Sequence, residues 1–196
     1  MTDIGNCTEK SDEELVVLTL ADREMYTCLI RRYEAPLTRY VRRISGASDD
    51  DVADILQNAF ISAYRNLNDF DPSLKFSSWM YRIVHNETIS QHRRRQTRPQ
   101  TISVEEGDDV FELLASEVDV PKDIDRRLAA RRIRNVLDTM DPKYREVLVL
   151  KFLEDKDYRE ISDILQKPMG TVATLINRAK KQFRERAEEG NIPLTQ

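Results

Sequence analysis

Hydrophobic residues recur at helical spacing along most of the chain, and the clearest run follows Ser48. Ser48 and Asp51 have the spacing of a helix N-terminal cap. Behind them, apolar side chains recur every three or four positions, at Val52, Ile55, Leu56, Ala59, Phe60, Ala63, Tyr64 and Leu67. This pattern predicts a long amphipathic helix with that face buried.

Two helices are predicted before this one. Ser11 and Glu14 have capping-box spacing, so a helix should begin at about Asp12. A second helical stretch is expected over residues 22–45, where Pro36 marks either a kink or the start of a new segment.

Another helix is predicted after the break at Asp71-Pro72-Ser73. Ser77 or Ser78 can cap it. Its apolar residues are Trp79, Met80, Ile83, Val84 and Ile89. Trp79 stands four residues before Ile83, and we interpret it as a core residue.

Residues 99–121 lack a sustained hydrophobic period and contain Pro99, Gly107 and Pro121. They are also acidic, as is typical of a flexible linker. The sequence therefore predicts two domains, over residues 1–98 and 122–196.

The second domain contains the pattern of a helix-turn-helix. Apolar stripes are expected at Ile133, Val136, Leu137, Met140, Val147, Leu148, Leu150 and Phe152. After them come a short helix over residues 158–165, a turn over 166–170 and a basic helix from Thr171. The outer face of that last helix carries Ala173, Thr174, Asn177, Arg178 and Lys181. Asn pairs with adenine, Arg with guanine and a Thr methyl with a thymine methyl, so this face has the chemistry of a major-groove reader. An ordinary helical hairpin with a solvated face is the alternative.

Composition supports an all-α fold. The 196 residues include only five glycines, which is too few for the turns of an all-β protein. No uncharged apolar run approaches the roughly 18 residues of a membrane-spanning helix, and the acidic N-terminus does not resemble a signal peptide. We expect a cytoplasmic protein with no membrane insertion. Cys7 and Cys28 suggest no disulfide framework, and with His85 and His92 they suggest no zinc site. No metal or other cofactor is expected.

The charge pattern points to DNA. The net charge is −4, and residues 103–119 carry seven acids and no base. In contrast, residues 75–98 and 171–186 are basic. Two separate basic segments favour two separate nucleic-acid contacts, although each could also be a solvated helix face.

Three stretches resemble bacterial sigma factors of the extracytoplasmic-function (ECF) group. The C-terminal one is MDPKYREVLVLKFLEDKDYREISDILQKPMGTVATLINRAKKQF. The two N-terminal ones are DDDVADILQNAFISAYRNLNDFD and KFSSWMYRIVHNETISQHRRR. The resemblance implies a subunit that binds core RNA polymerase, directs it to promoter DNA and helps to open the duplex. The family commonly has an anti-sigma partner, and whether this chain has one is left open by the sequence.

The resemblance also implies roles for particular residues. Contacts to the minus-ten promoter element are expected from Lys75, Phe76, Arg82, Asn86, Arg93 and Arg94. Contacts to the minus-thirty-five element are expected from Thr171, Thr174, Asn177, Arg178 and Lys181. Polymerase binding is expected from Asp50, Asp54, Gln57 and Asn58. The chain departs from the family at Asn58, where Glu is usual, and at Gln166, where Gly is frequent.

Three other classes of function are alternatives to a sigma factor. An enzyme is not expected, because His85-Asn86-Glu87 lacks the second half of a zinc-deaminase motif and no nucleotide-binding or metalloprotease motif is present. An autonomous helix-turn-helix regulator, which binds operators without polymerase, is the main alternative to a sigma factor. A helical adaptor that binds only proteins is the third.

Overall fold

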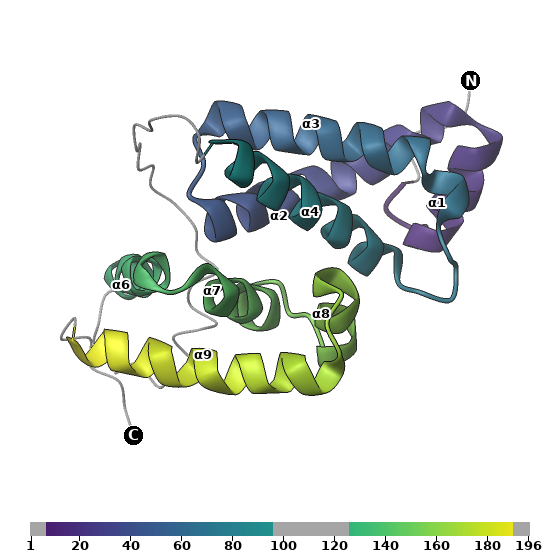
Figure 1. The fold of residues 1–196 in the computed structure, drawn as a ribbon. Helices are drawn as coiled ribbons and strands as arrows, with labels where there is room; N and C mark the ends of the chain where they lie inside the picture. Colours follow the sequence, from purple (N-terminus) through teal and green to yellow (C-terminus); the bar gives the residue numbers. More distant parts are fainter. Residues whose placement is uncertain (1–6, 96–125, 190–196) are drawn as a thin grey trace. The chain divides into compact units, whose positions relative to one another are not determined.

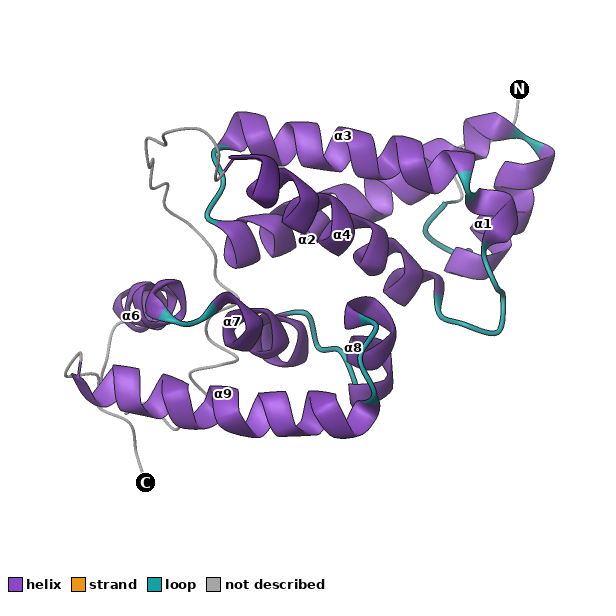
Figure 2. Ribbon diagram, in the orientation of Figure 1, coloured by secondary structure: helices purple, strands orange, loops and turns teal. Residues whose placement is uncertain are grey.

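The computed structural model describes residues 7–95 and 126–189, which fall in an N-terminal and a C-terminal unit. Each unit is described by itself. All regular structure in the two described ranges is helical (Figure 2), and no helix there is long and apolar enough to span a membrane. The predicted linker, 99–121, and the predicted domain boundaries at 98 and 122 lie outside the described residues.

The N-terminal unit is built on three long helices that pack against one another (Figure 1). In chain order its elements are α1 (Asp12–Ala21), η2 (Arg23–Met25), α2 (Tyr26–Ser45), α3 (Asp49–Arg65), η3 (Leu67–Asp69) and α4 (Phe76–Arg95). Helices α2, α3 and α4 make the bundle, and α1 packs against α2, α4 and the turn η3. The four predicted helices are confirmed.

Two helix starts show how the caps work. At α1 the capping box is present, because the Ser11 hydroxyl accepts from the Glu14 amide at 3.1 Å and the Glu14 carboxylate accepts from the Ser11 amide at 2.7 Å. These bonds lower the pKa of Glu14. At α3 the expected cap is different: the Ser48 hydroxyl donates to the buried Asp51 carboxylate at 2.6 Å and caps no amide.

Helix α2 runs through Pro36 without ending, so this proline does not begin a separate helix. Pro36 has no N–H to donate to the carbonyl of Arg32 one turn earlier. The helix stops at Gly46, whose φ of 60° is left-handed backbone that favours glycine.

The core of the N-terminal unit comes largely from the predicted stripes, in which Phe60, Ile83 and Ile89 are half-buried. The α3 positions 52, 55, 56, 59 and 63 are buried, and Trp79 on α4 is buried as expected. Tyr64, however, is 42% exposed, so its assignment to the core was wrong. Its ring meets that of Tyr26 at a centroid distance of 5.0 Å.

Cys7 and Cys28 form a disulfide, which the sequence analysis did not expect. The segment before α1 folds back over α2, and this brings the two Cα atoms to 5.5 Å. Pairing across 21 residues depends on that fold and cannot be read from the spacing of two cysteines.

The C-terminal unit contains α6 (Arg126–Thr139), α7 (Pro142–Leu148), the π-helical segment η4 (Val149–Leu153), α8 (Tyr158–Leu165) and α9 (Met169–Glu189). Helix α9 packs along α7 and α6. The predicted apolar stripes of α6, α7 and η4 are buried, together with Val149 and Leu153. Asp141 caps α7, because its side chain accepts from the Lys143 amide at 3.1 Å.

Candidate nucleic-acid interface

The helix-turn-helix is formed by α8, a short turn and α9. A capping box starts α8: the Asp157 side chain accepts from the Glu160 amide at 2.8 Å, and the Glu160 side chain accepts from the Asp157 amide at 3.0 Å. Helix α9 begins at Met169, two residues before the predicted start. The reason is that the Pro168 carbonyl accepts from the amides of residues 171 and 172, which closes the first turn.

The turn between the two helices depends on Gln166. Its φ of 52° and ψ of 45° are left-handed, a conformation that glycine adopts most readily. The Lys167 amide donates to the Ser162 carbonyl at 3.1 Å, and the Ser162 hydroxyl donates to the Lys167 carbonyl at 2.6 Å. These bonds hold the turn although its left-handed residue carries a side chain.

Helix α9 has one buried and one exposed face. The buried side chains are Val172, Ile176, Ala179, Phe183 and Ala187. The five residues expected to contact the minus-thirty-five element are all exposed: Thr171, Thr174, Asn177, Arg178 and Lys181. Their spacing of three or four residues puts them on one side of the helix. The Thr174 hydroxyl donates to the Gly170 carbonyl at 2.9 Å, so its hydrogen is used within the helix.

A second exposed segment, residues 71–75, joins η3 to α4. Asp71 organises it: its carboxylate accepts from the Ser73 amide at 2.9 Å and its carbonyl from the Leu74 amide at 3.0 Å. The hydrogen bonds with Ser73 lower the pKa of Asp71. The segment is therefore a compact turn that keeps a negative charge at neutral pH.

Phe76, expected to contact the minus-ten element, is a core residue. Its side chain is 1% exposed and its ring meets Tyr33, Phe70 and Trp79 at centroid distances of 5.4–5.6 Å. A base cannot reach this ring without repacking the core. Phe70 is buried too, so segment 71–75 is fixed at both ends by aromatic anchors.

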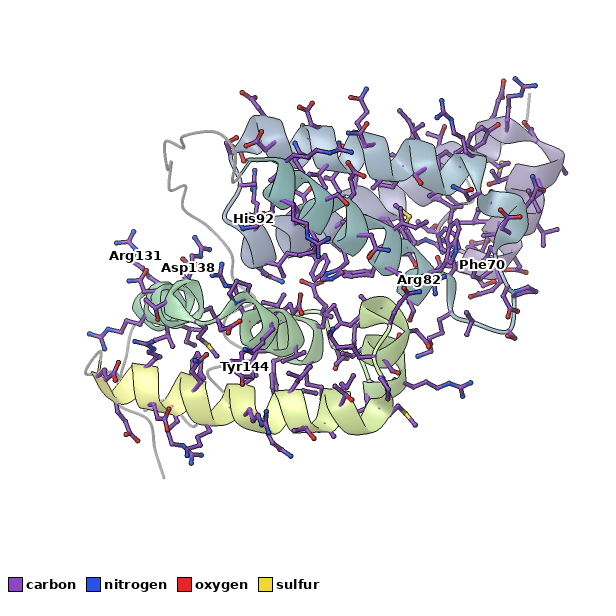
Figure 3. All side chains as sticks on the ribbon, in the orientation of Figure 1. Phe70, Arg82, His92, Arg131, Asp138 and Tyr144 are labelled. Carbon is purple, nitrogen blue, oxygen red and sulfur yellow. A yellow bond between two sulfur atoms is a disulfide. The ribbon has the colours of Figure 1, made fainter. Side chains whose placement is uncertain are left out.

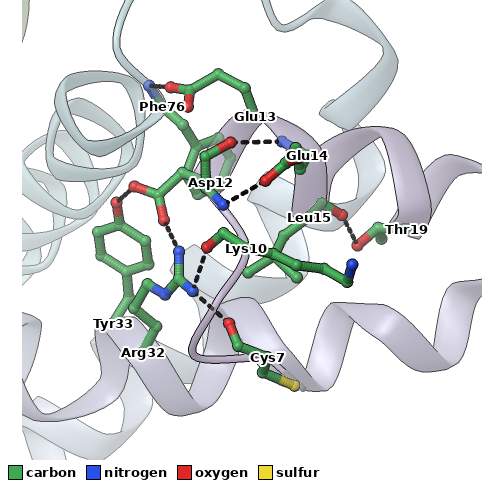
Figure 4. A network of polar contacts seen from close by, with 11 residues as sticks. Cys7, Lys10, Asp12, Glu13, Glu14, Leu15, Thr19, Arg32, Tyr33 and Phe76 are labelled. Atoms are coloured by element: carbon green, nitrogen blue, oxygen red, sulfur yellow. Dashed lines mark hydrogen bonds and ion pairs between the residues drawn. The ribbon is translucent and has the colours of Figure 1, made fainter. Parts of the chain in front are cut away.

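The start of α4 also differs from the expectation. Ser77 and Ser78 lie inside its first turn rather than capping it, and Ser78 is buried. The amide of Phe76 instead donates to the carboxylate of Glu13 on α1 at 3.4 Å (Figure 4). That partner is 63 residues away in sequence, so local spacing could not identify it.

Four of the five remaining minus-ten candidates follow one side of α4 and the residue before it. Lys75, Asn86, Arg93 and Arg94 are exposed and Arg82 is half-buried. Positions 75, 82, 86 and 93 are 7, 4 and 7 residues apart, which is close to whole helical turns. These four therefore share one face, which is about 27 Å long. Arg82 and His92, labelled in Figure 3, both belong to α4, the first in its N-terminal half and the second near its C-terminal end.

Helix α3 exposes a third surface. The four predicted polymerase-binding residues, Asp50, Asp54, Gln57 and Asn58, are all exposed. Ile61 and Tyr64 continue the same side of the helix and are 43% and 42% exposed. Sequence reasoning missed these two, because both have the side chains of core residues. Their helical register with Asp54 and Gln57 was the available signal.

Comparison with known proteins agrees with this two-part architecture. The model of Sigma-70 region 2 matches residues 29–98. The model of Sigma-70, region 4, matches residues 130–183. These are the promoter-recognition regions of bacterial transcription initiation factors, so the class of protein is defined by both halves of the chain.

Full-length relatives define the family more closely. The chain is 30% identical over 172 residues to the ECF RNA polymerase sigma factor SigW of Bacillus subtilis, covering 86% of this chain and 91% of that one. It is 30% identical over 178 residues to the ECF RNA polymerase sigma-E factor of Haemophilus influenzae, covering 85% and 89%. The chain belongs to the ECF RNA polymerase sigma factors.

Solved structures share the fold. CnrH, in a complex with the cytosolic domain of CnrY, aligns with a TM-score of 0.67 and 23% identity over 92% of this chain and 99% of that one. The sigma factor RpoE of Bartonella quintana, in a complex with the anti-sigma factor NepR, aligns with a TM-score of 0.63 and 18% identity, covering 83% and 96%.

Family membership gives the function. The chain is a transcription initiation factor that binds core RNA polymerase and directs it to promoters, and the autonomous regulator is not supported. The family is one of non-enzymatic factors.

Proposed function

We propose that this sigma factor divides its work among three exposed helix faces: α9 reads the minus-thirty-five element, α4 with segment 71–75 binds the minus-ten element, and α3 binds core polymerase. The observation that carries the proposal is the exposure of polar side chains at helical spacing on all three helices. The proposed place of action is the cytoplasm, where polymerase and promoter DNA meet.

On α9, direct base reading is assigned to Asn177 and Arg178. Both are exposed, and both side chains can make two hydrogen bonds to one base edge in the major groove. Thr174 contributes its methyl group, because its hydroxyl already donates to Gly170. Lys181, whose side chain is 80% exposed, supplies charge to a phosphate.

On α4, opening of the duplex is assigned to Asn86 with the cations around it. Lys75, Arg82 and Arg93 lie on the same side of the helix and can hold the phosphates of a separated strand. With Phe76 removed from the contact set, the turn of residues 71–75 is the place for an unstacked base. Four of its five residues are exposed, Leu74 is half-buried, and its ends are fixed.

On α3, polymerase binding is assigned to the polar face with Ile61 and Tyr64 added. A polar surface that ends in exposed apolar side chains has the composition of a protein-binding site, where aromatic residues contribute most.

An anti-sigma factor is proposed as a further partner. The structural relatives CnrH and RpoE were both solved in complexes, with CnrY and with NepR. A protein that covers the DNA-binding and polymerase-binding faces would hold this chain inactive.

The test is a comparison of Arg178→Ala with Asn86→Ala in two assays on the reconstituted polymerase. We expect Arg178→Ala to reduce discrimination among minus-thirty-five sequences by about tenfold, since one bidentate base contact is worth about 1–3 kcal/mol. We expect Asn86→Ala to reduce permanganate reactivity of promoter thymines while minus-thirty-five discrimination stays unchanged. Arg184→Ala removes the same charge from another side of α9 and is the control.

Either of two results would contradict the assignment. One is equal loss of discrimination in Arg178→Ala and Arg184→Ala, which would mean that α9 contributes charge alone. The other is a normal opening reaction in Asn86→Ala combined with weaker binding to core polymerase.

A further inference from the structure

We propose that Cys7 and Cys28 are a reversible thiol–disulfide site that locks the N-terminal strap, residues 7–11, onto α2 when the two thiols are oxidised. The two sulfur atoms are bonded in the structure, and the Cα atoms are 5.5 Å apart, within the range of a disulfide. Cys28 lies in the first turn of α2 and is 1% exposed, while Cys7 lies on the strap and is partly exposed.

The compartment in which the chain works favours a disulfide that forms reversibly over a permanent one. As an initiation factor the chain works where polymerase is found, and we have proposed that this is the cytoplasm. Thiols there are kept reduced, and the disulfides that do form are mostly transient and redox-sensing. This inference rests on the proposed function, because it takes the cytoplasm as the place where the chain works. The pair is reduced in the resting cell and is oxidised when the concentration of oxidant rises.

Polar contacts keep the two thiols close after reduction (Figure 4). The Arg32 guanidinium pairs with Asp12 at 2.5 Å and donates to the carbonyls of Cys7 at 2.5 Å and Lys10 at 2.8 Å. The Tyr33 hydroxyl donates to the other oxygen of Asp12. Burial raises the pKa of Tyr33, so this phenol stays a donor at physiological pH. Closure of the disulfide is therefore an intramolecular step with a high effective concentration.

The oxidant is a peroxide, and the chemistry balances as follows. The Cys7 thiolate, on the exposed side, attacks one peroxide oxygen, the O–O bond breaks, and Cys7 becomes a sulfenic acid with release of water. The Cys28 sulfur then attacks the Cys7 sulfur, its own proton leaves with the hydroxyl, and a second water is released. Two thiols and one hydrogen peroxide become one disulfide and two waters. A dithiol reductant reverses the change by exchange.

The strap that the disulfide holds is connected to segment 71–75, the turn proposed to bind DNA. The strap leads directly into α1, whose second residue, Glu13, accepts from the Phe76 amide at the start of α4. Phe76 immediately follows segment 71–75. When the disulfide fixes the strap, α1 can take fewer positions relative to α2. The start of α4, which is hydrogen-bonded to Glu13 of α1, can then also take fewer positions. We infer that the oxidised form holds segment 71–75 better ordered and opens promoters severalfold more efficiently.

The experiment uses the full chain in two states, treated with hydrogen peroxide or with dithiothreitol. Intact mass should show the loss of two hydrogens per chain on oxidation without formation of dimers. Amide exchange should slow in residues 7–14 and 74–78 of the oxidised form. The melting temperature of the N-terminal unit should rise by about 10 °C, because a loop of this length is strongly constrained in the unfolded state.

Cys7→Ser is the matched variant, since it removes the partly exposed sulfur and leaves the buried one. Peroxide should leave its amide exchange and its melting temperature unchanged. Absence of an intramolecular disulfide in the wild-type chain overturns the proposal. So does equal exchange of residues 74–78 in both states of the wild type, a measurement that needs no variant to fold.

Promoter opening by reconstituted polymerase separates this inference from the proposed function. Faster opening with the oxidised chain supports it, and equal opening with both forms overturns the connection to segment 71–75. Opening by neither form would contradict the proposed function, while the mass and exchange results would still decide the thiol–disulfide site.

Discussion

At the scale of single residues, left-handed backbone is found in the described part of the chain at Gly46, Asp155 and Gln166. Gly46 ends α2 and Gln166 ends α8, with φ values of 60° and 52°. Glycine adopts this conformation without steric cost, whereas a residue with a Cβ atom is strained there by about 1 kcal/mol. The turn of the helix-turn-helix therefore carries a small strain that the helix end at Gly46 does not.

Replacing Gln166 with glycine should stabilise the C-terminal unit. We expect the free energy of unfolding to rise by about 0.5–1 kcal/mol, because the strain at φ 52° is removed. Chemical denaturation followed by circular dichroism measures this change. Gln166→Ala keeps a Cβ atom and should have little effect; a gain equal to that of the glycine variant would show that the side chain, not the backbone, is responsible.

At the scale of helices and turns, the sequence predicts an element correctly where that element is stabilised by residues close to it in the chain. Apolar periodicity located the stripes of α3, α6 and α9, and Ser11 with Glu14 identified the start of α1. It failed where one element depends on a distant one. Glu13 supplies the cap expected from Ser77 or Ser78, and Cys28 pairs with a residue 21 positions earlier.

The predicted site residues also fall into two groups: in one, exposure follows from the local helical period, and in the other it depends on tertiary packing. The predicted polar site residues on α3, α4 and α9 are exposed, except for the half-buried Arg82, since helical periodicity also determines which side faces solvent. Phe76 and Tyr64 were assigned to the wrong environments. An apolar side chain fits equally well in a core and in a binding surface, and only tertiary packing decides between them.

The exposed apolar end of α3 gives a prediction for polymerase binding. We expect Tyr64→Ser and Ile61→Ser each to weaken binding to core polymerase by about tenfold, because partly exposed apolar anchors provide much of the affinity of a protein interface. Titration of labelled protein with core enzyme measures the Kd. Val17→Ser on α1, where the side chain is 67% exposed, is the control and should bind normally. Equal weakening by all three variants would show a nonspecific effect of surface polarity.

At the scale of the whole molecule, charge is distributed unevenly. The chain has a net charge of −4, while α9 exposes lysines and arginines on its outer face. Seven uncompensated acids in residues 103–119 should repel the phosphates that these basic faces attract. The free chain should consequently bind promoter DNA weakly, and core polymerase should change this by holding both DNA-binding faces on one duplex, where two weak contacts act together.

Changing those seven acids to Asn and Gln tests the role of the repulsion. We expect the free chain to bind promoter DNA more tightly at low salt, with the gain shrinking as ionic strength rises and screens the charges. Gel shift across a salt series without polymerase makes the measurement. No gain at any salt concentration would mean that the acids only keep this segment solvated.

The two aromatic anchors of segment 71–75 have a consequence for how promoter preference evolves. Phe70 and Phe76 are buried on either side of the segment, so its ends are set by the core and not by its own five residues. Under the proposed function, substitutions within these five residues should change which promoters are recognised, while the helical scaffold that holds the segment stays the same.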